Sequence, residues 1–194
     1  GLVSDAGTPL ISDPGYKLVE TAIAEGHPVF AIPGASALLA GLVVAGLPSD
    51  QISFAGFAPS RTHARKRFFE GFSDRDGTLA FYESGPRLAA SLADMLVVLG
   101  NRSGVVAREL TKRHEEVRRG ALADLAAHYR QADPPRGEII VLIGPSEGAT
   151  EPDADDLDAK LHRAMARLSV KDAADQVSAE TGLKRKVVYS RALA

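Results

Sequence analysis

Two short apolar segments near the start of the chain each run into a glycine-containing turn and then into a helix. Residues 1–3 precede a loop over residues 4–15, and residues 28–32 precede the turn Pro33-Gly34 and a helical segment over residues 35–45. The order strand, loop, helix, strand, helix is typical of a parallel α/β layer, in which helices cover a sheet. This part of the sequence therefore predicts an α/β fold with loops at the carboxyl ends of its strands.

Local signals predict where these two helices begin and end. Asp13 and Pro14 predict the start of the first helix, because aspartate caps a helix and proline fits its first turn. Gly26 predicts its end. The segment 35–45 is apolar nearly all round, which predicts a buried helix.

Beyond residue 47 the chain mixes strands and helices in a different way. Strands are predicted at residues 52–57, 78–82, 105–109, 115–119 and 138–143, and helices at residues 61–72, 86–99 and 122–131. The third and fourth strands are close enough in sequence to form a hairpin. We expect residues 1–47 to be the remainder of an N-terminal α/β domain and residues 48–144 to form a second, α+β domain.

The C-terminal part separates into a linker and a helical module. Residues 145–156 are acidic and rich in glycine and proline, which predicts a linker. Residues 157–194 predict three helices with a short glycine turn, the helix-turn-helix pattern, which reads DNA or serves as a protein or RNA contact module. Ser169 is the expected cap of the second helix, with Asp172 at its third helical position. The side chains expected to face inward on that helix are Ala173, Ala174 and Val177.

Composition excludes several kinds of protein. The 194 residues contain no cysteine, so a disulfide framework, a thiolate zinc site and a cysteine nucleophile are excluded. The five histidines show no ligand spacing, so no metal is expected. Lys and Arg number 23 against 25 Asp and Glu, a net charge of −2, so any polyanion must be held by a local basic patch.

Targeting signals are also absent from the sequence. No apolar run approaches the length of about 18 residues that would suggest a membrane span, and no signal-peptide pattern is present. A cytoplasmic protein is therefore expected. The chain opens at Gly1 in what resembles the end of a strand, so we expect an N-terminal truncation.

Two loops are candidate binding elements. The loop beginning at Asp5 follows the first predicted strand, and the turn at Gly34 follows the second. Ligands of open α/β sheets bind at the carboxyl ends of strands, and a helix N-terminus offers free N–H groups there. Ordinary structural turns are the alternative for both. The first loop has neither the GxGxxG nor the Walker A pattern, which argues against a dinucleotide fingerprint and a phosphate cradle.

Two charged segments are candidate substrate contacts. Residues 61–67 contain four basic side chains, which suits contacts with RNA phosphates, although a solvated helix start has the same composition. Phe68 and Phe69, which follow, are expected in the core. Arg108 and Glu109 directly follow an apolar strand, where a charge is costly unless it is paired or used. A solvated hairpin tip is the alternative there.

Five motifs in order resemble those of the ribosomal RNA small-subunit methyltransferase I family, within the tetrapyrrole-methylase (class III) fold. They are VSDAGTPLISDPGY, IPGASALLAGLVVAGLPSD, TLAFYESGPRL, VVARELTKRHEEVRRG and PRGEIIVLIG. The likeness covers residues 1–144, and the tail matches the family's C-terminal helix-turn-helix. The resemblance implies two α/β domains with a donor cleft between them, and S-adenosylmethionine as methyl donor. It also implies 2′-O-methylation of a cytidine ribose in small-subunit ribosomal RNA, and a homodimer.

The resemblance also implies site residues. The expected donor contacts are Ala6, Gly7, Thr8, Ile11, Ser36, Ala37, Tyr82, Glu83, Ala107 and Arg108. The expected RNA contacts are Arg61, Arg65, Lys66, Arg67, Lys112 and His114. Two features depart from the family: its first strand with a Gly-Asn loop does not occur in this sequence, and Gly85 stands where Ser-Pro-His-Arg is more usual.

Methyl transfer to a ribose hydroxyl requires a base or a charge-stabilising group, because the hydroxyl is a weak nucleophile. Glu109 and Asp5 are the candidate bases. Lys112 or Arg108 is the candidate for stabilising the developing alkoxide or holding a phosphate. Two other functions remain open from the sequence: a tetrapyrrole-precursor methylase of the same fold, and a truncated fragment that binds RNA or dimerises without turnover.

Overall fold

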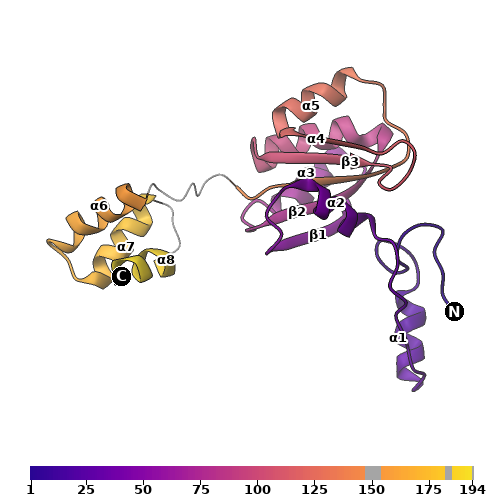
Figure 1. The fold of residues 1–194 in the computed structure, drawn as a ribbon, viewed down its shortest axis with the longest axis horizontal. Helices are drawn as coiled ribbons and strands as arrows, with labels where there is room; N and C mark the ends of the chain where they lie inside the picture. The colour runs from indigo at the N-terminus through magenta and orange to yellow at the C-terminus, as the bar shows by residue number, and fades with distance from the viewer. Residues whose placement is uncertain (147–153, 182–184, 194) are drawn as a thin grey trace. The chain divides into compact units, whose positions relative to one another are not determined.

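A computed structural model describes residues 1–146, 154–181 and 185–193 of the chain (Figure 1). It divides into two compact units, Gly1–Pro145 and Ser146–Ala194, which are treated separately below. No helix in these described residues is long and apolar enough to span a bilayer.

The first unit is built on a five-stranded mixed sheet in the order β1-β2-β5-β3-β4. The strands are β1 (Ile52–Phe57), β2 (Thr78–Ser84), β3 (Ser103–Arg108), β4 (Glu116–Ala121) and β5 (Glu138–Ile143). β1 and β2 are parallel, while β5 lies antiparallel between β2 and β3. The predicted hairpin is confirmed, since β3 pairs antiparallel with β4.

Alternate residues of the strands belong to two hydrophobic cores, one on each face of the sheet. Phe81, Val141 and other fully buried side chains pack against α4 and α5 on one face. Ala80 and Ile140 belong to the second core, which α2 covers. The helices are α2 (Ala37–Ala45), α3 (Thr62–Glu70), α4 (Gly85–Leu99) and α5 (Leu122–Gln131). Successive side chains of a strand point to opposite faces, so a continuous apolar run such as that of β5 places apolar side chains on both faces.

Helix α4 begins at Gly85, the position that departs from the family motif. A Cβ at position 85 would collide with the Pro135 carbonyl oxygen. Pro86 stands in the first turn of the helix, where its missing N–H costs nothing. The close approach of the chain at Pro135 thus requires glycine at this point.

The N-terminal segment differs from the prediction. Residues 1–3 and 28–32 form no strand, and Phe30 and Ile32 are more than four-fifths exposed. A strand requires a partner for its backbone hydrogen bonds, and no described strand pairs with these residues. The first helix, α1 (Tyr16–Ala24), starts after Gly15 rather than at Asp13 and buries no side chain.

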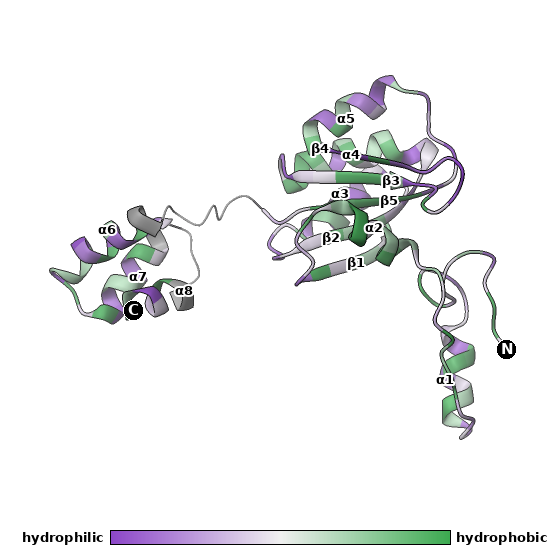
Figure 2. Ribbon diagram, in the orientation of Figure 1, coloured by the Kyte–Doolittle hydropathy of each residue, from purple (hydrophilic) through white to green (hydrophobic). Residues whose placement is uncertain are grey.

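Helix α2 was expected to be buried, and that expectation is also wrong. Figure 2 shows that it is hydrophobic along its length, yet Leu39 and Val43 are 61% and 85% exposed. Only Gly41 and Ala45 are buried, against the sheet. An apolar helix that covers one face of a sheet buries one side of itself and leaves the other uncovered.

The second unit contains α6 (Ala154–Met165), α7 (Val170–Thr181) and α8 (Arg185–Ala192). The predicted inward positions are confirmed, since Ala173, Ala174 and Val177 are all buried. The predicted cap of α7 also forms: the Ser169 hydroxyl accepts the Asp172 N–H at 3.2 Å and donates to its carboxylate at 2.7 Å. Most of the predicted linker, residues 147–153, lies outside the described residues.

Candidate functional site

A cavity of about 770 Å³ opens at one end of the sheet. Its wall is formed by four separate parts of the chain: the first loop, the turn before α2, the ends of several strands, and the hairpin after β3. The lining residues from the first two parts are Asp5, Ala6, Gly7, Thr8, Ile11, Ser12, Asp13, Ala35, Ser36, Ala37 and Ala40. Those from the sheet and hairpin are Phe57, Tyr82, Glu83, Ala107, Leu110, Thr111, Lys112, Glu138, Ile139 and Ile140.

A hydrogen bond joins the two loops. The Thr8 hydroxyl donates to the Ala35 carbonyl oxygen at 3.0 Å across 27 positions of sequence. Ser36 then caps α2 by accepting the Leu39 N–H at 3.5 Å. The first N–H groups of a helix have no partner within it, so the start of α2 offers donors to an anionic group in the cavity.

The ends of β2 and β5 supply Tyr82 and Glu138. The Tyr82 ring packs edge-on against Phe54 with centroids 4.9 Å apart. Burial raises the pKa of Tyr82; the backbone of Leu38 opposes this shift and the charge of Glu138 adds to it. The Tyr82 hydroxyl therefore stays neutral at physiological pH, next to the first turn of α2.

Lys112 lines the cavity, and its ammonium group lies between two carboxylates. Its Nζ is 3.0 Å from Glu109 Oε1 and 3.0 Å from Glu138 Oε2. Hydrogen bonds to Glu109 and then Glu138 raise the pKa of Lys112. Lys112 therefore remains a cation across the neutral range, and its charge is locally balanced.

Glu109, one of the two candidate bases, contacts two residues of the cavity wall, Lys112 and Glu138. It does not line the cavity, and its Oε1 accepts the Glu138 N–H at 3.0 Å as well as the Lys112 ammonium. The Glu138 backbone N–H, followed by Lys112, holds the pKa of Glu109 below its usual range. A carboxylate so occupied is a weak proton acceptor, which removes the main argument for Glu109 as the base.

Arg108, an expected donor contact, also lies off the cavity. Its Nε is 2.8 Å from Glu116 Oε2 across the β3–β4 ladder, and Arg108 lowers the pKa of that carboxyl. This pair joins the two strands of the hairpin. His114, in the connection between those strands, is exposed and does not line the cavity.

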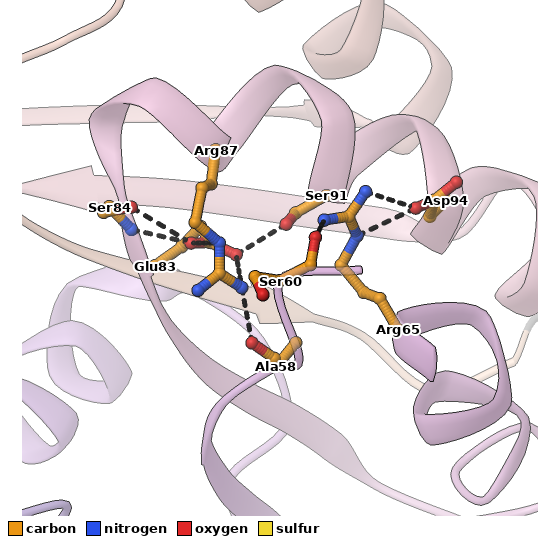
Figure 3. A network of polar contacts seen from close by, with 8 residues as sticks. All are labelled: Ala58, Ser60, Arg65, Glu83, Ser84, Arg87, Ser91 and Asp94. Carbon is orange, nitrogen blue, oxygen red and sulfur yellow. Dashed lines mark hydrogen bonds and ion pairs between the residues drawn. The ribbon is translucent and has the colours of Figure 1, made fainter. Parts of the chain in front are cut away.

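The basic helix α3 divides into an exposed and a buried part. Arg61 and Arg67 are exposed, whereas Arg65 is only 4% exposed. The Arg65 guanidinium holds Asp94 at 2.6 and 2.8 Å and donates to the Ser60 carbonyl at 3.0 Å (Figure 3). The prediction that Arg65 contacts RNA is therefore wrong, because its charge is used inside the protein. Lys66 is half-exposed, 3.7 Å from the same carboxylate.

Glu83 borders the cavity, but its carboxylate points into a second buried cluster (Figure 3). It accepts from the Ser84 N–H at 2.8 Å and from the Ser91 hydroxyl at 2.5 Å, and Arg87 lies 3.2 Å away. Arg87 also donates to the Ala58 carbonyl. This cluster ties the end of β2 to the segment that follows β1.

Several cavity residues were not predicted, chiefly Phe57 and Glu138. Phe57 is the last residue of a predicted strand. The rule that ligands bind at the carboxyl ends of strands therefore applies to it as it does to Tyr82. Glu138 is the first residue of β5. Because β5 runs antiparallel to β2 and β3, its first residue lies at the edge of the sheet where those two strands end. That direction is not visible in the sequence. Among the described residues, no group of three or more His, Asp or Glu side chains is arranged to hold a metal ion.

Comparison with known proteins gives consistent matches. A family model described as Tetrapyrrole (Corrin/Porphyrin) Methylases matches residues 2–126, and one described as the RsmI C-terminal HTH domain matches residues 151–194. Ribosomal RNA small subunit methyltransferase I of Mesorhizobium japonicum is 46% identical over 193 residues, which are 99% of this chain and 65% of that protein. The protein of the same name from Erythrobacter litoralis is 53% identical over 166 residues, which are 86% of this chain and 58% of that protein.

The chain thus spans less than two thirds of the length of these two relatives. Among solved structures, the methyltransferase CobJ superposes with a TM-score of 0.53 at 21% identity, covering 72% of this chain and 62% of that one. A likeness at that identity bears on the fold alone, and it agrees with the α/β architecture predicted from the sequence.

Proposed function

The chain belongs to the ribosomal RNA small subunit methyltransferase I family of the tetrapyrrole-methylase fold, and we propose that it binds S-adenosylmethionine in the cavity and methylates small-subunit ribosomal RNA. The finer proposal is transfer of the methyl group to a cytidine ribose 2′-hydroxyl. The observation that carries the donor-site proposal is the Thr8–Ala35 hydrogen bond, which joins two loops 27 positions apart around one cavity.

The residues of the cavity fit the donor chemically. Its volume of about 770 Å³ lies within the range of about 300–1,000 Å³ that is usual for small-molecule sites. The N–H groups at Ser36 and Ala37 would hold the donor's carboxylate, as helix N-termini hold anions. The apolar wall at Ile11, Ala40 and Ile140 would bury its adenine ring. S-adenosylmethionine, when bound, supplies an electrophilic methyl group on a sulfonium.

The protein's own contribution is to align and activate the ribose hydroxyl. Positioning of two reactants can supply about 7–11 kcal/mol of the barrier. We propose Asp5 as the group that takes the hydroxyl proton, because Asp5 lines the cavity and Glu109 does not. Lys112 is proposed to hold the flanking phosphate, since Lys112 lines the cavity and stays charged.

RNA contacts outside the cavity are proposed for the exposed basic side chains of α3, Arg61 and Arg67, and for His114 on the hairpin. A cytoplasmic setting follows from a ribosomal substrate. The proposal also includes a homodimer, which the exposed apolar side chains Leu39 and Val43 of α2 support.

The test is a methyl-transfer assay with radiolabelled S-adenosylmethionine and two acceptors. Small ribosomal subunits from cells lacking this methylation are expected to incorporate label at a cytidine ribose, located by primer extension. Uroporphyrinogen, the acceptor of a tetrapyrrole-precursor methylase, is expected to incorporate none. Labelling of uroporphyrinogen alone would reject the RNA proposal, and labelling of neither acceptor would favour a non-catalytic chain.

A further inference from the structure

An exposed aromatic ring stands at the rim of the cavity without an assigned role. Two aromatic side chains are found among the described residues that line the cavity, Tyr82 and Phe57. Phe57 is 53% exposed, although its chain neighbours Gly56 and Ala58 are both buried. An exposed ring is common on a protein surface, but this one lies beside a cavity, where its free face is available to a ligand.

A bulge in β1 sets the direction of this ring. The pairing of β1 with β2 shifts between Phe54 and Phe57, so that Phe57 lies opposite Tyr82. Gly56 has a φ of +62°, a conformation that favours glycine, and a Cβ there would lie 2.6 Å from the Ser12 hydroxyl of the first loop. Bulges are frequent beside functional sites, where they re-aim a side chain.

The ring is also held firmly in place. Its centroid lies 5.5 Å from that of Tyr82, which supports it from one side. The segment after it is fixed by two arginines, because Arg87, which is partly exposed, donates to the Ala58 carbonyl and the buried Arg65 donates to the Ser60 carbonyl (Figure 3). A ring fixed in this way loses little conformational freedom on binding, which favours affinity.

The charged side chains that follow Phe57 in the chain favour RNA over S-adenosylmethionine as the ligand for the exposed face of its ring. The exposed cations Arg61 and Arg67 come next in the chain, at the start and end of α3. S-adenosylmethionine has no phosphate and is positively charged at sulfur, and its one carboxylate is proposed above to lie at the start of α2, so it gives these cations no further anionic group to pair with. An unpaired nucleotide has a base to stack and phosphates on either side.

We propose that Phe57 is the stacking platform for an unpaired base of the RNA, next to or at the methylated nucleotide. This inference rests on the proposed function and adds the residue that binds the base. Base–aromatic stacking does not depend on salt, whereas phosphate contacts do. Loss of the Phe57 ring should therefore weaken RNA binding without changing its salt dependence.

The test uses the purified chain and a single-stranded RNA that carries pyrrolo-cytidine, whose fluorescence is quenched when it stacks. The sequence contains no tryptophan, so protein emission does not interfere. Affinity for the RNA is measured by anisotropy at several salt concentrations, and affinity for S-adenosylmethionine by calorimetry. The variants are Phe57→Ala, Phe57→Tyr, which keeps the ring, and Phe30→Ala as a matched control, since Phe30 is 81% exposed and does not line the cavity.

Phe57→Ala should bind the RNA about 10-fold or more weakly and lose the quenching, with an unchanged salt slope and unchanged donor affinity. Phe57→Tyr and Phe30→Ala should behave as the wild type. An unchanged RNA affinity in Phe57→Ala would overturn the inference, as would a loss of donor affinity alone, which would place the adenine ring on Phe57. If the wild type binds donor but not this RNA, this inference fails, while labelling of small ribosomal subunits still decides the RNA substrate. If the wild type binds no donor, the proposed function fails as well.

Discussion

Replacing Arg65 with alanine should lower the free energy of unfolding of the Gly1–Pro145 unit by about 3–5 kcal/mol. The guanidinium and the Asp94 carboxylate form a nearly solvent-free pair, with side chains 4% and 10% exposed. Removal of one partner leaves the other charge buried without compensation, and Lys66, 3.7 Å from Asp94 Oδ1, is too far away to replace the two short contacts that Arg65 makes with Oδ2. Urea unfolding followed by circular dichroism measures the loss.

Two controls separate this pair from the general effect of removing an arginine. Arg61→Ala, on the same helix but exposed, should change stability by no more than about 0.5 kcal/mol. The double variant Arg65→Met with Asp94→Leu should recover most of the loss, because an apolar pair of similar volume needs no compensation. If Arg65→Ala is no more harmful than Arg61→Ala, the pair does not stabilise the fold as described.

Asp5→Asn should reduce the rate of methyl transfer to small ribosomal subunits by about 10²–10⁴-fold, the usual contribution of general base catalysis. An amide has nearly the shape of the carboxylate but cannot accept the hydroxyl proton. Affinity for S-adenosylmethionine should change little, because the donor is held mainly by the loop backbone and the start of α2. Single-turnover kinetics with saturating donor isolate the chemical step.

Glu109→Gln is the matched comparison for this variant. Glu109 is not among the residues that line the cavity and accepts hydrogen bonds from Glu138 and Lys112, so its amide should cost far less activity than Asp5→Asn. The reverse order would return the role of base to Glu109 and refute the assignment of Asp5.

The central sheet could be predicted because its signals are local. β1, β5 and α5 begin and end where the sequence indicated, since apolar runs bounded by glycine, proline and charged residues mark these elements. The segments 1–3 and 28–32 carry the same signals but form no strands. A strand depends on a partner, and local sequence does not report whether a partner is available.

The cavity was predictable in part for the same reason. Thr8 and Ser36 follow segments predicted to be strands, and the rule that strand ends meet at one edge predicts that they lie close together. The two segments form no strands, and the hydrogen bond from Thr8 to the Ala35 carbonyl joins the loops instead. Glu109 failed that rule because it has a φ of 47° at the start of the hairpin, and the turn directs its carboxylate to Glu138. Residue spacing does not reveal such a reversal.

The burial of Arg65 is partly visible in the helical spacing of the sequence, although the basic composition of residues 61–67 suggests an exposed side chain. Arg65 stands four positions before Phe69, which is fully buried, and residues four apart share one face of a helix. The helical period therefore places Arg65 on a different face from Arg67. It does not distinguish Arg65 from Arg61, which stands four positions earlier, and Arg61 is exposed because it lies at the N-cap. The partner that makes burial possible, Asp94, comes from another helix and could not be paired with it from the sequence.

Calorimetric titration with S-adenosylmethionine tests the cavity most directly, using two phenylalanine substitutions on α2. Ala40 lines the cavity, whereas Val43 is 85% exposed and does not. The wild type and Val43→Phe should bind one donor molecule with the same affinity, and Ala40→Phe, which fills the cavity, should bind at least about 10-fold more weakly, a difference of about 1.4 kcal/mol. Equal binding by all three proteins, or none by the wild type, would contradict the assignment of the donor to this cavity.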